Sequence, residues 1–274
     1  MSDPPVALEI AWLGHATCDI RIGGCRFMTD PLLRDHVAHL RRHAGTATLE
    51  PGPVTATLIS HIHHDHLDPA SLRRLPAGSP LVVPRGAGRL VRRAARGEVI
   101  EVSVGDELVF DGVRVTAVPA DHRPNRALSR AKAEPLGFVL EGGGRVVYFP
   151  GDTDLHPVMH DLPAPDVALL PIWGWGPSLG VGHLDPPRAV QAAHALRARS
   201  VLPVHWGTFA PISWRQPRWL LVPGSEFTTA MGREAPDIEL HLVQPGSELI
   251  AFPSQQGGRN PGGDDGWRRG ESNP

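Results

Sequence analysis

The fold is decided by a histidine-rich stretch, Ser60-His61-Ile62-His63-His64-Asp65-His66-Leu67-Asp68. It directly follows an apolar run, residues 54–59, whose length and β-branched residues predict a buried strand. The histidines are therefore expected on a loop at the carboxyl end of that strand. Because alternate side chains of an extended chain share a face, His61 and His63 can bind one metal ion together.

Asp65 and His66 follow where the chain turns, and they can bind a second ion beside the first. Imidazole nitrogens suit zinc, iron, nickel or copper, and a carboxylate can bind an ion or orient a water. A histidine-rich surface loop without function is the ordinary alternative. An H-x-H-x-D-H string at a strand end instead favours a metal site, and further ligands are then expected at other strand ends.

Three more apolar strands are each expected to end close to a metal-binding side chain, namely His122, Asp152 and His205. Open α/β sheets place their sites at the carboxyl ends of their strands, so these side chains can meet the histidine-rich loop. The sequence predicts a first ion held by His61, His63 and His122, a second held by Asp65, His66 and His205, and Asp152 between the two ions.

This ligand set is typical of catalysis rather than of a structural metal site. Structural zinc is usually closed by four protein ligands that include cysteine, and neither cysteine is close to the pattern. Two ions about 3.5–4 Å apart lower the pKa of a bridging water from about 15.7 to about 7. We expect a hydroxide shared by two divalent ions, with Asp65 as a catalytic residue that holds it in line. Zinc is the first choice of metal, with manganese or iron as alternatives.

Composition and charge indicate the broad class of the protein. The 274 residues are 41% hydrophobic and carry a net charge of −2, which predicts a globular chain and gives no reason to expect nucleic-acid binding. No apolar run approaches the roughly 20 residues of a transmembrane helix. We expect one domain over residues 1–253 and a disordered tail over residues 254–274, which are rich in glycine, proline and polar residues.

Two cysteines, Cys18 and Cys25, fall in one predicted hairpin, where they can face each other or point apart. Two cysteines are too few for a disulfide scaffold, and no secretory signal is visible at the start, so a cytoplasmic protein is expected. Residues 32–53 form a polar excursion in which we expect at most one short helix.

The histidine-rich string resembles the signature of the metallo-β-lactamase-fold hydrolases. The resemblance covers about residues 6–252 and implies an α/β fold, a four-layer αββα sandwich with one or two metal ions between its sheets. Within that family it is closest to the branch of N-acyl-phosphatidylethanolamine phospholipase D and ascorbate-6-phosphate lactonase. The motifs that carry this branch are Trp12-Leu13-Gly14-His15, Thr29-Asp30-Pro31, Gly151-Asp152-Thr153, His183 ahead of Asp185-Pro186, and His205-Trp206-Gly207-Thr208-Phe209.

His15 and Asp30 fall at strand ends, where either could serve turn chemistry or hold the far nitrogen of a ligand histidine. The resemblance favours the second role. It also implies a catalytic role for His183, and it matches Arg126, four residues after His122, to a position that can bind a phosphate oxygen.

A glycine-rich loop is expected over the site, with Trp173 and Trp175 as apolar walls that contact the substrate. Residues 176–180 of this loop, GPSLG, match the G-x-S-x-G motif of serine hydrolases. That motif needs a strand directly before it and a helix directly after it. Because neither flank fits, the glycine-rich loop is the preferred interpretation.

The sequence favours a small anionic substrate and hydrolysis of a phosphodiester. Hydrolysis of a lactone or another carboxylic ester is second, since the same hydroxide attacks a carbonyl. A single-iron persulfide oxygenase is a distant alternative that would leave the second ligand group without a purpose. A non-enzymatic metal-binding protein is the remaining alternative.

Overall fold

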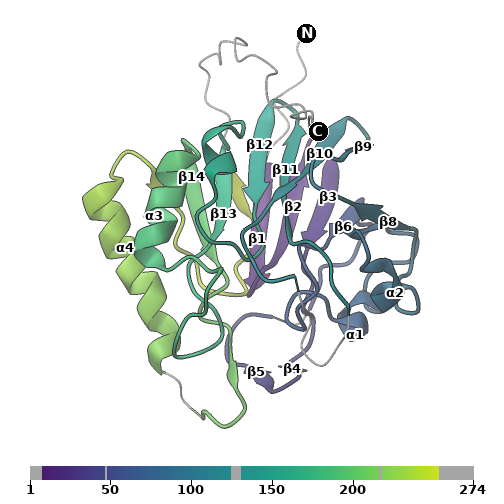
Figure 1. The fold of residues 1–274 in the computed structure, drawn as a ribbon, viewed down its shortest axis with the longest axis horizontal. Helices are drawn as coiled ribbons and strands as arrows, with labels where there is room; N and C mark the ends of the chain where they lie inside the picture. Colours follow the sequence, from purple (N-terminus) through teal and green to yellow (C-terminus); the bar gives the residue numbers. More distant parts are fainter. Residues whose placement is uncertain (1–7, 47, 125–130, 216–217, 253–274) are drawn as a thin grey trace, which may run out of the picture.

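The computed structural model describes residues 8–46, 48–124, 131–215 and 218–252. Two seven-stranded sheets form its centre (Figure 1). The first sheet has the order β17 (Ile250–Phe252), β1 (Leu8–Gly14), β2 (Thr17–Ile22), β3 (Cys25–Thr29), β6 (Ala56–Leu58), β7 (Leu81–Pro84) and β8 (Val99–Val102). The second has the order β16 (Glu239–Leu240), β14 (Ser200–Val204), β13 (Val167–Pro171), β12 (Arg145–Phe149), β11 (Leu136–Gly142), β10 (Val113–Pro119) and β9 (Glu107–Phe110).

The helices lie outside the sheets, α3 and α4 on one side and α1 and α2 on the other (Figure 1). Their bounds are α1 (Pro69–Leu72), α2 (Gly88–Val91), α3 (Pro186–Ala195) and α4 (Val222–Glu234), with short 3-10 helices η1 (Pro157–His160) and η2 (Arg218–Leu221). The α1 and α3 helices each begin with proline after an aspartate whose side chain accepts a main-chain N–H, a favourable start for a helix.

The first sheet is apolar on both faces because it is covered on both. In β1, Ile10 and Trp12 join the core between the two sheets, whereas Ala11 and Leu13 join a second core beneath α1 and α2. Side chains alternate across a strand, so a strand between two layers must be apolar throughout. The four layers predicted from the resemblance, αββα, are confirmed.

The described part of residues 32–53 contains no helix. They form β4 (His36–Val37) and β5 (Leu40–Arg42), which join β15 (Phe209–Pro211) in a small third sheet. β5 pairs with a strand about 170 positions away, at Phe209↔Arg42 and Pro211↔Leu40. That pairing has no local sequence pattern, which is why the small sheet was not predicted.

The strand directions bring many carboxyl ends to one edge. In the first sheet, β1 and β3 are both antiparallel to β2, and β6 is parallel to β3. In the second, β10 and β12 are both antiparallel to β11, and β13 and β14 continue in parallel. The loops that follow these seven strands can therefore meet at the same end of the sandwich.

Cys18 and Cys25 are both buried free thiols. Among the described helices, none is long and apolar enough to cross a membrane. The tail predicted for residues 254–274 lies outside the described residues.

Candidate metal centre

His66 lies at the centre of the site and is fully buried. Its Nδ1 donates a hydrogen bond of 2.7 Å to Asp30 Oδ2. Its Nε2 lies 3.0 Å from Nε2 of His205 and 3.2 Å from Oδ2 of Asp152. Since Asp30 takes the Nδ1 proton, Nε2 is the atom of His66 that can bind a metal.

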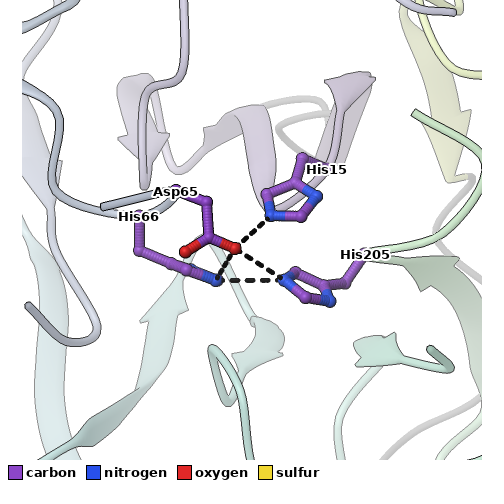
Figure 2. A group of neighbouring side chains, drawn as sticks. All are labelled: His15, Asp65, His66 and His205. Carbon is purple, nitrogen blue, oxygen red and sulfur yellow. Dashed lines mark hydrogen bonds and ion pairs between the residues drawn. The ribbon is translucent and has the colours of Figure 1, made fainter. Parts of the chain in front are cut away.

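Asp65, His205 and His15 surround the same point, and Figure 2 shows their side chains directed toward one another and toward His66. Asp65 Oδ2 lies 3.8 Å from Nε2 of His205 and accepts a hydrogen bond of 2.9 Å from Nε2 of His15. The other ring nitrogen of His205, Nδ1, donates to the carbonyl of Trp173 over 2.9 Å. These contacts bring the predicted second ligand group together, with His15 holding Asp65.

The first predicted group, His61, His63 and His122, is also gathered, with its ligand nitrogens within 4.8 Å of one another. Nε2 of His122 lies 3.0 Å from Nδ1 of His63. The other ring nitrogen of His122 donates to the carbonyl of Gly182 over 2.6 Å. Nδ1 of His61 lies 3.0 Å from the hydroxyl of Ser60, which leaves Nε2 of His61 toward the site.

Asp152 lies between the two groups. Its Oδ1 is 3.2 Å from Nε2 of His205, and its Oδ2 is 3.9 Å from Nε2 of both His61 and His122. The sequence predicted this central place, which suits a carboxylate that binds two ions.

The donor set fits divalent metal ions on two observations. Nε2 of His61 and Oδ1 of Asp152 are buried without a hydrogen-bond partner among the described residues, a costly arrangement unless a cation binds them. In addition, Nε2 of His66 and of His205 face each other while both Nδ1 atoms donate elsewhere. Two lone pairs that face each other require a cation or a proton between them.

The charges of the site are those of a cation-binding cluster. Burial lowers the pKa of His61 well below its usual value and that of His122 to about 4, so both imidazoles are neutral and able to bind metal. Burial alone would raise the pKa of Asp65 and Asp152, but the neighbouring histidines hold both well below the usual range. Burial would lower the pKa of His66, whereas Asp152 and Asp65 raise it well above its usual value.

Three of these residues adopt a left-handed backbone, which is uncommon outside glycine: His15 (φ 56°), Asp30 (φ 32°) and His205 (φ 62°). The turns directly after β1, β3 and β14 therefore aim these side chains into the site. Main-chain hydrogen bonds hold the turns, including that from His205 N–H to the His15 carbonyl at 2.9 Å. Strain of this kind persists only where surrounding contacts fix it.

A cavity of about 710 Å³ opens onto the two ligand groups. The remaining predicted residues differ in their relation to it. His183 lines the cavity, with Nε2 3.4 Å from Oδ2 of Asp152, and Trp175 lines it as well. Trp173 instead packs against the core between the sheets, and its indole N–H donates to the Gly176 carbonyl over 2.9 Å. Arg126 lies outside the described residues.

Several functional residues had not been singled out. His39 contacts the Trp175 ring at 4.8 Å and lines the cavity, as does Arg123. Ser60 donates its hydroxyl proton to Asp30 and contacts His61. Ser60 and Arg123 each directly adjoin a predicted ligand in the sequence, a signal that could have found them.

The comparisons with known proteins agree with this geometry. A family model described as the β-lactamase superfamily domain matches residues 25–206. The chain belongs to the β-lactamase superfamily. Within the superfamily it is similar to a metal-dependent hydrolase of Nitratidesulfovibrio vulgaris, 31% identical over 258 residues that cover 91% of this chain and 98% of the relative. Its two sheets between outer helices are the metallo-β-lactamase fold of this superfamily.

Two further relatives in the superfamily are longer than this chain. A Mycobacterium tuberculosis protein is 31% identical over 239 residues, 80% of this chain. The N-acyl-phosphatidylethanolamine-hydrolyzing phospholipase D 1 of Caenorhabditis elegans is 30% identical over 230 residues, 74% of this chain. The chain spans 64% of the length of each.

Solved structures share the superfamily fold. Igni18, a metallo hydrolase of Ignicoccus hospitalis, superposes with a TM-score of 0.69 at 23% identity and covers 91% of this chain and 100% of its own. An isothiocyanate hydrolase from Delia radicum gut bacteria superposes with a TM-score of 0.67 at 17% identity. The match covers 90% of this chain and 100% of the hydrolase. CmlA, a diiron β-hydroxylase of Streptomyces venezuelae, superposes with a TM-score of 0.64 at 18% identity. The match covers 92% of this chain and 55% of CmlA. At these identities the likeness concerns the fold.

Proposed function

We propose that the protein is a two-metal phosphodiesterase acting on a small anionic substrate. One observation carries the anionic class: the described acidic residues that line the cavity are Asp65 and Asp152, both within the ligand groups. The other ionisable lining residues are Arg123 and histidines. A cavity whose ionisable groups outside the ligand groups are arginine and histidine attracts a phosphodiester and gives no anchor for a cationic substrate.

The ligand groups would hold two divalent ions, one in the His61–His63–His122 group and one in the Asp65–His66–His205 group, with Asp152 contacting both. Such ions, when bound, lower the pKa of a water between them and polarise the bond under attack. His15 holds Asp65 through a hydrogen bond, which keeps the Asp65 carboxylate directed toward His66 and His205 (Figure 2). Zinc is proposed first, with manganese or iron as alternatives.

His183 is proposed to assist the leaving oxygen. Its side chain is 20% exposed and lines the cavity, whereas His61, His66 and His205 are buried. Its Nδ1 donates to the Gly180 carbonyl over 3.1 Å, so Nε2 is the atom presented to the cavity. Burial would lower the pKa of His183, but the contact with Asp152 raises it above the usual value, which favours the protonated ring. In that form Nε2 can donate a hydrogen bond to a phosphate oxygen, and Trp175 supplies an apolar wall beside it.

The similarity to the nematode phospholipase D supports phosphodiester chemistry. Lactone or carboxylic-ester hydrolysis is the second candidate. It is favoured by the apolar part of the cavity lining, Leu40, Leu179 and Val181, which suits an uncharged ester as well as a diester.

The test starts from protein stripped of metal with a chelator and reloaded separately with zinc, manganese or ferrous iron. Metal content is measured, and turnover is followed with bis-p-nitrophenyl phosphate, a panel of lactones and p-nitrophenyl acetate. We expect two ions per chain and the highest kcat/KM on the diester. Higher kcat/KM on a lactone would overturn the phosphodiesterase proposal, and no uptake of metal would overturn the metal site.

A control variant shows whether loss of metal is specific to the ligand groups or follows the removal of any histidine. Asp152→Asn should lose metal and activity together. His194→Ala, in which an exposed histidine of α3 is removed, should behave as the wild type. Equal losses in both variants would contradict the assignment of Asp152.

A further inference from the structure

The loop between β13 and α3 supplies main-chain acceptors to a histidine of each ligand group. At its start, the Trp173 carbonyl accepts the Nδ1 proton of His205 over 2.9 Å. At its end, the Gly182 carbonyl accepts the Nδ1 proton of His122 over 2.6 Å. His205 follows β14 and His122 follows β10, so one loop reaches ligands from separate strands of the second sheet.

These two contacts decide which nitrogen of each ring can bind metal. A carbonyl oxygen only accepts, so each Nδ1 must carry the proton and each Nε2 keeps its lone pair. Both Nε2 atoms point toward Asp152, at 3.2 Å from His205 and 3.9 Å from His122. Because the acceptors belong to the main chain, the path of the loop fixes the orientation of both rings.

Gly182 is required by this path. It has a φ of +82°, and a Cβ placed on it would lie 3.1 Å from Nδ1 of His122 and 3.2 Å from Cα of His122. Both the backbone conformation and the close approach to His122 favour glycine. The glycines of the GPSLG motif lie in the same loop, which is thus a support for ligands rather than a nucleophile elbow.

We infer that residues 173–182 are a positioning element for both metal ions, with Gly182 as the positioning residue for the ion bound by His61, His63 and His122. The inference rests on the proposed function, because it assumes that the two groups bind metal. Residues 174–176 and 178–181 also line the cavity, so the segment that orients the ligands is the segment that a substrate contacts.

The test compares Gly182→Ala with Gly144→Ala. Gly144 also has a positive φ, +73°, but a Cβ placed on it meets nothing within 4 Å, and it lies in the β11–β12 turn. Both variants place alanine in an unfavourable left-handed backbone conformation, and only Gly182→Ala displaces His122. Zinc affinity is measured by competition with a chromophoric chelator, using zinc alone. We expect one of two zinc ions to bind about 10–100-fold more weakly in Gly182→Ala, the usual effect of disturbing a ligand's partner.

Two other readouts keep the test independent of activity and folding. Nitrogen-15 NMR of the histidines should show that His122 loses its fixed Nδ1–H form in Gly182→Ala. If that variant fails to fold, Trp173→Phe tests the other end, because it removes the bond from the indole N–H to the Gly176 carbonyl. This variant should lower the affinity for the ion of the Asp65–His66–His205 group. Trp219→Phe should not, because the indole N–H of Trp219 has no partner among the described residues.

The inference is overturned if Gly182→Ala and Gly144→Ala bind two zinc ions with equal affinities, or if Trp173→Phe and Trp219→Phe do. Wild-type protein that binds two ions and hydrolyses the diester would then still support the proposed function. Wild-type protein that binds no zinc would overturn the proposed function itself.

Discussion

At the scale of single residues, Asp65 gives the most direct test of the site. It belongs to the second ligand group and is held by His15 at 2.9 Å. Asp65→Asn keeps the size of the side chain but removes its charge, so the water would lose its orientation. We expect kcat to fall by about 10²–10³-fold, the usual effect of removing one group that stabilises the transition state. Near-wild-type turnover at equal zinc content, with an unchanged circular dichroism spectrum, would contradict the assignment.

Ser60 is a second residue whose effect can be isolated. Its hydroxyl donates to Asp30, which holds His66, and contacts Nδ1 of His61, so it touches the supports of both ligand groups. Ser60→Ala should therefore weaken zinc binding by about 10-fold.

Ser71→Ala is the matched control for Ser60→Ala. Ser71 is also fully buried, and its hydroxyl also donates to an aspartate, Asp68, away from the ligands. Both variants should lower the free energy of unfolding by about 1–3 kcal/mol, because each leaves buried groups without a partner. Only Ser60→Ala should alter zinc affinity in a chelator competition; equal zinc affinity in the two variants would refute this role.

At the scale of elements, the positions of many strands along the chain and the metal-binding side chains at their ends were predictable. Apolar runs ended by His61, His122, Asp152 and His205 each carry a local signal, and parallel strands bring their carboxyl ends together. Main-chain acceptors such as the Gly182 carbonyl were not predictable, because every residue has a carbonyl and only the folded path selects one. The β4–β5–β15 sheet was missed because its pairing depends on contacts distant in sequence.

The β12 strand carries a testable pH dependence through Tyr148, the single tyrosine of the sequence. Burial raises the pKa of its hydroxyl well above the usual value, and the hydroxyl has no hydrogen-bond partner among the described residues. Above about pH 10 the unfolded chain loses this proton and the folded chain keeps it. The unfolded state then binds fewer protons, so stability falls as pH rises.

Tyr148→Phe should remove this alkaline loss. At pH 8 the variant should be neutral or up to about 1 kcal/mol more stable, since a buried unpaired polar group is removed. Urea unfolding at pH 8 and pH 10.5 measures both effects. Cys18, whose thiol pKa is also raised by burial, remains in both proteins and gives a common background. An identical alkaline loss in the two proteins would refute the prediction.

At the scale of the whole molecule, the ligands join the two sheets. His61 and His66 follow β6 of the first sheet, whereas His122, Asp152 and His205 follow strands of the second. Metal ions held between them should therefore stabilise the fold as a whole. Zinc at 100 times its dissociation constant should add about 2.7 kcal/mol, which raises Tm by roughly 5–10 °C for a domain of this size. Calorimetry with and without chelator measures the change, and an unchanged Tm would show that zinc does not bind selectively to the folded protein.

Acid should weaken the metal-free fold for a related reason. Burial lowers the pKa of His15 to about 3 and that of His122 to about 4, against about 6.5 in an unfolded chain. Between pH 6.5 and 4 the unfolded state therefore binds more protons, and stability must fall as pH falls. Chemical unfolding across this interval measures the slope, which His15→Gln should reduce; a constant stability would contradict the burial of neutral histidines. Because neutral imidazole is also the metal-binding form, zinc should dissociate over the same interval in which the fold weakens.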